Sequence, residues 1–189
     1  MKRTEMDILL ALNRLIARMD MEKITTGKII DEAKISRATF YRYFKDKYDV
    51  LNRNYKELLD SCLRECGGYR ELFLLLFRHA QKEWSDFHRA FSTTGVNSFE
   101  NYISSYSRSV VEQITAENRG GQGLTAEEEL QMDVFCSGIS VMYKKWTLGK
   151  YDLSATAAAD ALYAAMPATL RNYWFLRTEG QVPVISGFA

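Results

Sequence analysis

The chain has 189 residues, of which 47% are hydrophobic, so it is long enough for one large domain or two smaller ones with a buried core. Two residues are Pro and eleven are Gly, which favours helices over a loop-rich β fold. The net charge is +1, but residues 1–56 hold 13 Lys and Arg against eight Asp and Glu, whereas residues 57–189 hold 12 against 16. A basic end joined to an acidic remainder fits a polyanion-binding module, although charge alone does not separate this interpretation from chance.

The sequence also excludes several classes of protein. Three cysteines, at positions 62, 66 and 136, form no disulfide framework and indicate a reducing compartment. Residues 1–5 contain no apolar segment of the kind that a signal peptide needs. The longest purely apolar run, residues 72–77, is far too short to span a bilayer. We therefore expect a soluble, cytoplasmic protein with no membrane partner.

The spacing of apolar residues predicts helices along the chain, and no window alternates as a strand would. We expect Thr4 to cap a first helix that ends near residue 20, Thr25 or Thr26 to cap a short second one, and Ser36 to cap a third that ends near residue 44. Further helices are predicted over residues 47–66, 69–84, 98–117, 125–148 and 154–177, with a short or irregular segment at 85–95 and a kink at Pro167. The expected fold class is all-α, with about nine helices.

Residues 26–44 have the length of a helix-turn-helix, in which two short helices cross through a tight turn and the second lies in the major groove. Five apolar residues would hold the two helices together: Ile29, Ile30, Ala33, Ile35 and Phe40. The pattern alone also allows a plain helical hairpin whose aromatic residues are core.

The exposed face of the second of these helices carries groups that suit DNA. Arg37 could donate two hydrogen bonds to a guanine, while Ala38 or the methyl group of Thr39 could contact a thymine methyl. Groups that suit phosphate oxygens are the hydroxyls of Thr26, Tyr41 and Tyr43 and the ammonium of Lys47 near a helix N-terminus.

The segment from Ile24 through Lys47 and on to Leu51 resembles the DNA-binding domain of the TetR family of bacterial regulators. The resemblance depends on the pattern Ser-x-x-Thr-Phe-Tyr-x-Tyr-Phe-x-x-Lys, which begins at Ser36 and is far more specific than a bare turn pattern. It covers roughly residues 4–51, and the later helices agree in number and order with the family's ligand-binding domain. It implies an effector-responsive repressor that binds a double-stranded DNA operator through Thr26, Arg37, Ala38, Thr39, Tyr41, Tyr43 and Lys47.

One residue departs from the family pattern. Turns of this type usually place Gly directly after the alanine, because that position favours positive φ, and here it is Lys34. A left-handed lysine costs about 1 kcal/mol, and its outward side chain could add a phosphate contact. We therefore include Lys34 in the DNA-binding set. The expected division is a DNA-binding domain at 1–46, a helical regulatory and dimerisation domain at 47–180, and a loosely ordered tail at 181–189.

The last two long helices are expected to form a homodimer interface, as they do in TetR relatives, where they pair with their mates as a four-helix bundle. One of them carries Val134, Phe135, Ile139, Met142, Tyr143 and Trp146, and the other carries Ala158, Ala161, Leu162, Ala165, Leu170, Tyr173 and Trp174. The same stripes could instead be intramolecular core. A small-molecule pocket is expected among the middle helices, with the helix from Phe73 to His79 as a further wall, although ordinary core is the alternative for each of its residues: Trp84, Phe87, Phe91, Phe99, Tyr102 and Tyr106.

We expect no cofactor, no metal and no enzyme activity. The two histidines lack partners at ligand spacing, and Cys62 with Cys66 supplies only half of a zinc site. No nucleophile–base pair or phosphate-binding loop stands out. A second interpretation stays open, because residues 143–150 and the Ala-rich helix after Ser154 resemble a TetR branch that includes activators of dihydroxyacetone kinase operons. That resemblance implies a coregulator or activator whose larger part binds a partner protein.

Overall fold

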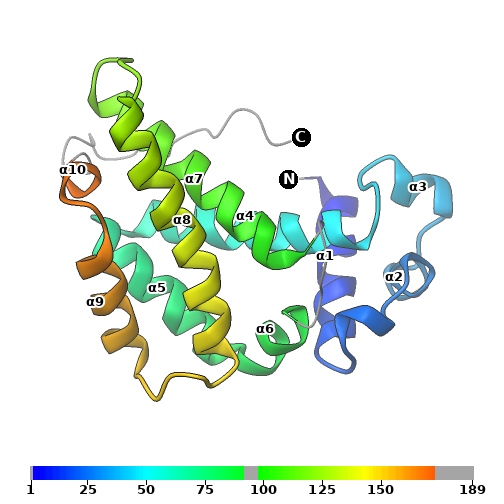
Figure 1. Cartoon of the computed structure of the whole chain (residues 1–189). Coiled ribbons are helices and arrows are strands. Elements are labelled where there is room, and N and C mark those ends of the chain that lie inside the picture. The colour runs from blue at the N-terminus through cyan, green and yellow to red at the C-terminus, as the bar shows by residue number, and fades with distance from the viewer. Residues whose placement is uncertain (1, 92–97, 173–189) are drawn as a thin grey trace.

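The computed structural model describes residues 2–91 and 98–172, with the backbone alone for Trp84 and Ser85, and this part of the chain is helical with no strand (Figure 1). The all-α prediction is therefore confirmed. The elements are α1 (Arg3–Ile16), the 3₁₀ turn η1 (Met21–Lys23), α2 (Thr26–Ala33), α3 (Arg37–Tyr41), α4 (Lys47–Glu65), α5 (Tyr69–Lys82), α6 (Trp84–Ala90), α7 (Phe99–Asn118), α8 (Ala126–Thr147), α9 (Ala155–Ala165) and α10 (Ala168–Arg171).

Side-chain caps determine where several of these helices begin. The hydroxyl of Thr25 accepts a hydrogen bond from the backbone N–H of Lys28 at 3.3 Å, and Asp46 accepts from two N–H groups of the first turn of α4. At α8, Thr125 and Glu128 form a capping box. These caps occupy backbone donors that a helix start leaves without partners.

Four predicted boundaries are wrong. Thr4 lies inside α1, which begins after Lys2 and ends at Ile16, four residues before the expected end. The third helix ends at Tyr41 and not near residue 44. The long helix predicted over 154–177 breaks after Ala165, because the residue before a proline is pushed out of the helical region and Met166 has ψ 131°. This break adds a tenth helix, α10.

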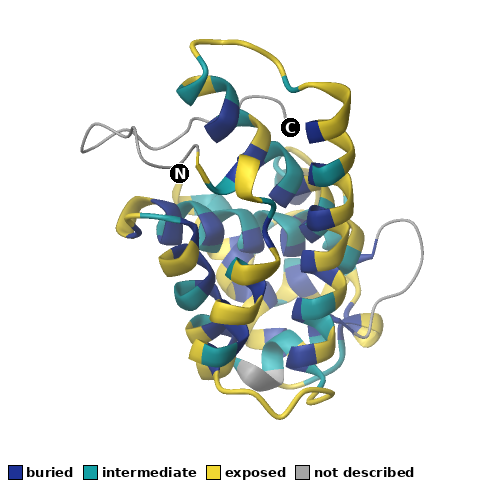
Figure 2. Ribbon diagram, turned by 60° about the vertical axis from the view of Figure 1, so that its left-hand side comes forward, coloured by how far each residue is buried: buried dark blue, intermediate teal, exposed yellow. Residues whose placement is uncertain are grey.

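Helices α1, α2 and α3 form a small bundle at one end of the molecule, and α9 and α10 lie at the other (Figure 1). Ile8, Leu12, Ile29 and Phe40 are fully buried at the centre of this bundle. In the larger part α5 packs against α9 and α7 packs against α8, and each of these four helices has a buried and an exposed face (Figure 2). Tyr173, Trp174 and the predicted tail at 181–189 lie outside the described residues. Within the described ranges no helix is both long and apolar enough to cross a bilayer.

The turn between α2 and α3 is built on a left-handed lysine. Lys34 has φ 55° and ψ 46°, and no other described residue except glycine has positive φ. Its N–H donates to the carbonyl of Asp31, and the N–H of Ile35 donates to the carbonyl of Ile30 at 3.2 Å. These hydrogen bonds are those of a helix C-cap that glycine usually supplies, so the turn has the expected geometry despite the substitution.

Replacing Lys34 by Gly should stabilise the chain by about 1 kcal/mol, because glycine adopts positive φ without the clash that a Cβ atom causes. Thermal or urea unfolding of the full chain measures this change. Lys34→Ala is the matched control, since it removes the same charge but keeps Cβ and should give no such gain. Equal stability of the two variants would show that the left-handed residue is not strained.

Candidate nucleic-acid interface

Helix α3 presents one face to solvent and one to the core. Ser36 caps it, because its hydroxyl accepts a hydrogen bond from the N–H of Thr39 at 3.1 Å. Phe40 on the inner side is fully buried, whereas Arg37 and Ala38 in the first turn are exposed. The structure thus brings the predicted base-reading residues to the exposed N-terminal end of the helix, which is the end that meets base edges in a helix-turn-helix.

Aromatic rings lie against the cations of this surface. The guanidinium of Arg37 lies 5.6 Å from the ring centroid of Tyr41, which is 48% exposed, and that of Arg42 lies 5.1 Å from the ring of Tyr43. Tyr43 is half-buried against the core. Such contacts restrict the rotamers of a long cationic side chain before it meets DNA. Arg42 is exposed beside the predicted set, and only the folded chain shows its ring contact.

The other predicted DNA-facing residues are close to the same surface. Thr26 is the first residue of α2 and is half-buried, while Thr25 before it provides the cap. Thr39 is half-buried, and its hydroxyl lies 2.9 Å from that of Ser36. The side chain of Lys34 is exposed at the turn. Thr26, Lys34, Arg37, Ala38, Thr39, Tyr41 and Tyr43 are therefore all exposed or half-buried.

Lys47 has a different role from the one predicted. Its ammonium donates to the carbonyl oxygens of Met21 at 2.9 Å, Glu22 at 3.2 Å and Ile24 at 2.7 Å. Burial lowers the pKa of Lys47, and the carboxylates of Glu22 and Asp46 oppose that shift. Because an ammonium has three N–H donors and all three are used, this arrangement leaves none for a phosphate. The direct contact expected from the sequence is not supported; the side chain instead ties η1 to the start of α4.

Two other cations of the basic end are also used internally. Arg14 and Arg18 of α1 both pair with the carboxylate of Glu32 on α2, each at 2.7 Å. The hydrogen bonds from these guanidinium groups lower the pKa of Glu32. The charge that faces outward from this part of the chain is therefore smaller than the composition implies.

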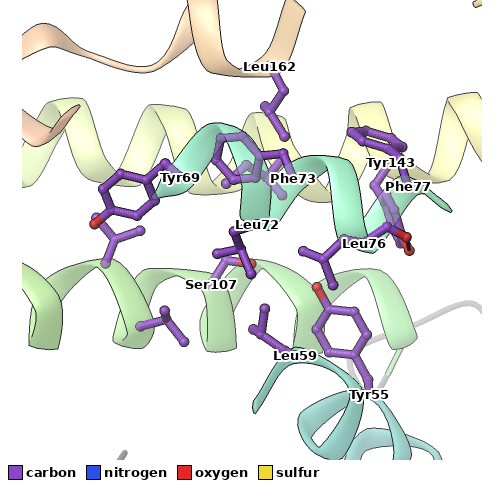
Figure 3. Close-up of a pocket in the computed structure, with 13 residues that line it drawn as sticks. Tyr55, Leu59, Tyr69, Leu72, Phe73, Leu76, Phe77, Ser107, Tyr143 and Leu162 are labelled. Carbon is purple, nitrogen blue, oxygen red and sulfur yellow. Dashed lines mark hydrogen bonds between the residues drawn. The ribbon is translucent and has the colours of Figure 1, made fainter. Parts of the chain in front are cut away.

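A cavity lies among the helices of the larger part (Figure 3). Its walls are mostly aliphatic and aromatic, with hydroxyl groups of Tyr55, Tyr143 and Ser107 among them. Its volume of about 30 Å³ is no more than a water molecule needs and is far below the roughly 300 Å³ at which ligand pockets begin. The lining residues are Tyr55, Leu59, Tyr69, Leu72, Phe73, Leu76, Phe77, Ser107, Val110, Val111, Ile139, Tyr143 and Leu162.

Phe73 and Phe77 of the predicted helical wall line this cavity, but none of the other predicted pocket residues is in its lining. Phe91 and Phe99 are buried with ring centroids 5.1 Å apart, and Tyr102 stacks on Tyr106 at 5.6 Å. Phe87 and Phe99 instead border a second cavity, of about 290 Å³, next to α1. The side chain of Trp84 lies outside the described part. The spacing of aromatic residues in the sequence correctly predicted rings that lie close together in the fold. It did not distinguish rings that pack in the core from rings that line a cavity.

Tyr106 belongs to a polar cluster that joins α4 to α7. Its hydroxyl donates to Asp60 at 2.8 Å, and the ammonium of Lys56 reaches the same carboxylate at 2.8 Å and the Tyr106 oxygen at 3.0 Å. Burial and the hydrogen bond to Asp60 both raise the pKa of Tyr106. This hydroxyl thus connects two helices and is not a free group for a ligand.

The described residues contain no group of three or more potential metal ligands. Cys62 and Cys66 are both buried, and burial raises the pKa of Cys62 to about 12, so its thiol is protonated at neutral pH. The arrangement offers no activated thiolate at this position.

A capped, exposed recognition helix packed on α1 and α2, with a larger helical part behind it, defines a helix-turn-helix regulator of transcription. Residues 8–53 match the family "Bacterial regulatory proteins, tetR family", so the chain carries the DNA-binding domain of that family. No curated protein matches the chain in sequence.

Two solved structures share the fold over most of their length. The "Dihydroxyacetone kinase operon activator DhaS" superposes with a TM-score of 0.59 at 15% identity, covering 93% of this chain and 99% of that one. The fatty acid degradation regulator FadR from Bacillus halodurans superposes with a TM-score of 0.55 at 15% identity, covering 88% of this chain and 95% of that one. At this identity the likeness establishes the fold.

Replacing Lys47 by Met should lower the free energy of unfolding by about 1–3 kcal/mol, because the apolar stem is kept while hydrogen bonds from a charged donor are lost. Urea unfolding of the full chain measures the loss, and Lys45→Met, at an exposed neighbouring position, is the control. A variant that unfolds like the parent but binds DNA with a shallower salt dependence would restore the phosphate contact as the role of Lys47.

Proposed function

We propose that the protein is an effector-responsive repressor that binds an operator in double-stranded DNA as a homodimer. The observation that carries this proposal is the exposed first turn of α3, where Arg37 and Ala38 face solvent while the Ser36 cap and buried Phe40 fix the helix. A side chain on a rigid element reads a base edge at lower entropic cost than one on a loop. The residues proposed to face DNA are Thr26, Lys34, Arg37, Ala38, Thr39, Tyr41 and Tyr43.

The proposed dimer uses α8 and α9. A single recognition helix reads only a few base pairs, so two copies on a pseudo-palindromic site are needed for specificity. Leu130 and Val134 on α8 are 65% and 67% exposed, which is unusual for aliphatic side chains one turn apart. They border a groove of about 510 Å³ between α8 and α9. Gly138 in this groove has open space around it, which favours close approach of a second helix.

The stripe predicted on α8 divides between two roles. Phe135, Ile139, Tyr143 and Trp146 are buried within the chain, whereas Val134 is exposed and Met142 is half-buried. The exposed residues and the groove support a homodimer interface, while the buried ones support the core. On α9, Ala161 and Ala165 are exposed at the same groove.

We propose that α4 transmits the effector signal. Near its start it is tied to α1, where Arg53 pairs with Glu5 at 3.1 Å and the amide of Asn54 donates to Asn13 at 2.8 Å. Further along, Tyr55 and Leu59 line the cavity of Figure 3. In the DNA-binding form the two recognition helices of the dimer are about one DNA turn apart, or roughly 34–36 Å. An effector that opens this cavity has different affinities for the two positions of α4. Only such a difference in affinity can change the spacing of the recognition helices.

A second candidate function is a coregulator or activator whose larger part binds a partner protein. The nearly closed cavity favours it, as does the shared fold with a protein described as an operon activator. Pull-down from a cell extract separates the two, since a stable partner supports this candidate. Selection of bound fragments from genomic DNA identifies the operator and, through its position, the sign of regulation.

Arg37→Ala should weaken binding to the selected operator by about 1–3 kcal/mol and relax the preference for the base that it contacts. Fluorescence anisotropy at one fixed salt concentration measures both effects. Arg64→Ala is the matched control, because Arg64 is exposed near the far end of α4. Unchanged affinity and preference in the Arg37 variant would remove this residue from the reading set.

Val134→Glu should convert the proposed dimer to monomers, because the substitution places two unpaired carboxylates in an apolar interface. Sedimentation velocity of both proteins at the same concentration gives the assembly state. Met6→Glu, at a position on α1 that is 42% exposed, is the control and should leave the dimer intact. A dimeric Val134 variant would place the interface elsewhere.

A further inference from the structure

The cavity of about 290 Å³ lies at the junction between the DNA-binding bundle and the larger part. Helix α1 contributes one wall and α4, α5, α6 and α7 contribute the others. It is distinct from the cavity of Figure 3, although Tyr55 borders both. The lining residues are Asn13, Ile16, Leu51, Asn54, Tyr55, Leu58, His79, Glu83, Asp86, Phe87, Ala90 and Phe99.

Three aromatic rings form much of the apolar wall. Phe99 lies between the other two, with ring centroids 5.5 Å from Tyr55 and 6.4 Å from Phe87. Leu51, Leu58 and Ile16 complete the apolar lining. Rings that pack against one another are already ordered, so they lose little conformational freedom when a ligand binds.

The polar lining of the cavity is acidic. Neither Lys nor Arg is among the lining residues, whereas Glu83 and Asp86 are. Asp86 lies 3.7 Å from Arg89, whose guanidinium donates to the carbonyls of Ile16 and Ala17 at the end of α1. The Glu83 carboxylate makes no ion pair or hydrogen bond within the described part of the chain.

His79 does not offset this negative charge. The ring centroids of His79 and Phe87 are 6.1 Å apart, and burial lowers the pKa of His79 below its usual value of 6.5. The nearby carboxylate of Glu83 acts in the opposite direction, and the exposed Lys82 acts in the same direction as burial. Burial therefore favours the uncharged imidazole, and Glu83 and Asp86 are the acidic side chains in the described lining.

We propose that this cavity binds an organic cation, an ammonium group on a compact apolar body. An anion would be repelled by the two carboxylates and would meet no cationic side chain in the lining, and a neutral apolar molecule would bury Glu83 without a partner. A cation satisfies the carboxylate, and its substituents contact the aromatic faces, which attract positive charge. Size agrees, since the cavity is near the lower limit of small-molecule sites.

The position of the site couples it to the DNA-binding bundle. Glu83 is the residue at which α5 ends and α6 begins, and Arg89 of α6 holds the last carbonyls of α1. A cation bound at Glu83 thus changes how α6 sits against α1. The effect on operator binding rests on the proposed function, whereas binding of the cation itself does not.

The test is calorimetric titration of the full chain, without DNA at neutral pH, with benzyltrimethylammonium chloride. Neopentylbenzene, which replaces the nitrogen by carbon in the same shape, is the neutral probe. Saturable binding of one cation per chain is expected. The affinity of the parent chain for the neutral probe, and the affinity of the Glu83→Gln variant for the cation, should each be lower by about tenfold or more. Glu129→Gln, at an exposed position on α8, should leave the affinity unchanged.

Phe87→Leu is a second variant, because it keeps apolar volume but removes an aromatic ring. It should also lower the affinity for the cation. Circular dichroism confirms that each variant is folded. Absence of saturable binding, equal binding of the neutral probe, or an unchanged Glu83→Gln variant would each overturn the proposal. The Arg37→Ala variant distinguishes failure of the cation site from failure of the proposed function. It should lose affinity for the operator and still bind the cation.

Discussion

Helix α4 packs against α1 of the DNA-binding bundle and against α5 and α7 of the larger part, and side-chain contacts hold it at its start and near its middle. Asp46 and Lys47 anchor its start, the first as a cap and the second through three carbonyls around η1. Further along, Lys56 and Asp60 join it to Tyr106 of α7. These contacts tie α4 to both parts of the chain, which is why the proposed effector signal is assigned to this helix.

The two cavities flank this helix and share Tyr55. One is apolar and nearly closed, so a ligand there must stabilise a more open state. The other is already open, acidic and in contact with α1. The proposed effector site and the proposed cation site would therefore act on the same element from different sides, and each ligand would alter the affinity for the other.

The electrostatics of the basic end show why composition overstates the DNA-binding charge. Arg14 and Arg18 pair with Glu32 at the surface, and Lys47 donates to backbone carbonyls. They stabilise the bundle that carries α3. The cations left at the surface, Lys34, Arg37 and Arg42 among them, are fewer but gather around the recognition helix.

The sequence by itself predicted features that depend on neighbouring residues: a cap at Thr25 or Thr26, the cap at Ser36, the helix-turn-helix, and the position of its turn at Lys34. Cap hydrogen bonds and turn hydrogen bonds join residues a few positions apart, so they follow from the local pattern. Tertiary structure alone decided the partners of Lys47 and Tyr106, which lie 23 to 26 and 46 positions away. Tertiary structure also decided which aromatic rings border a cavity. The spacing of residues within one helix does not show which other helix packs over them.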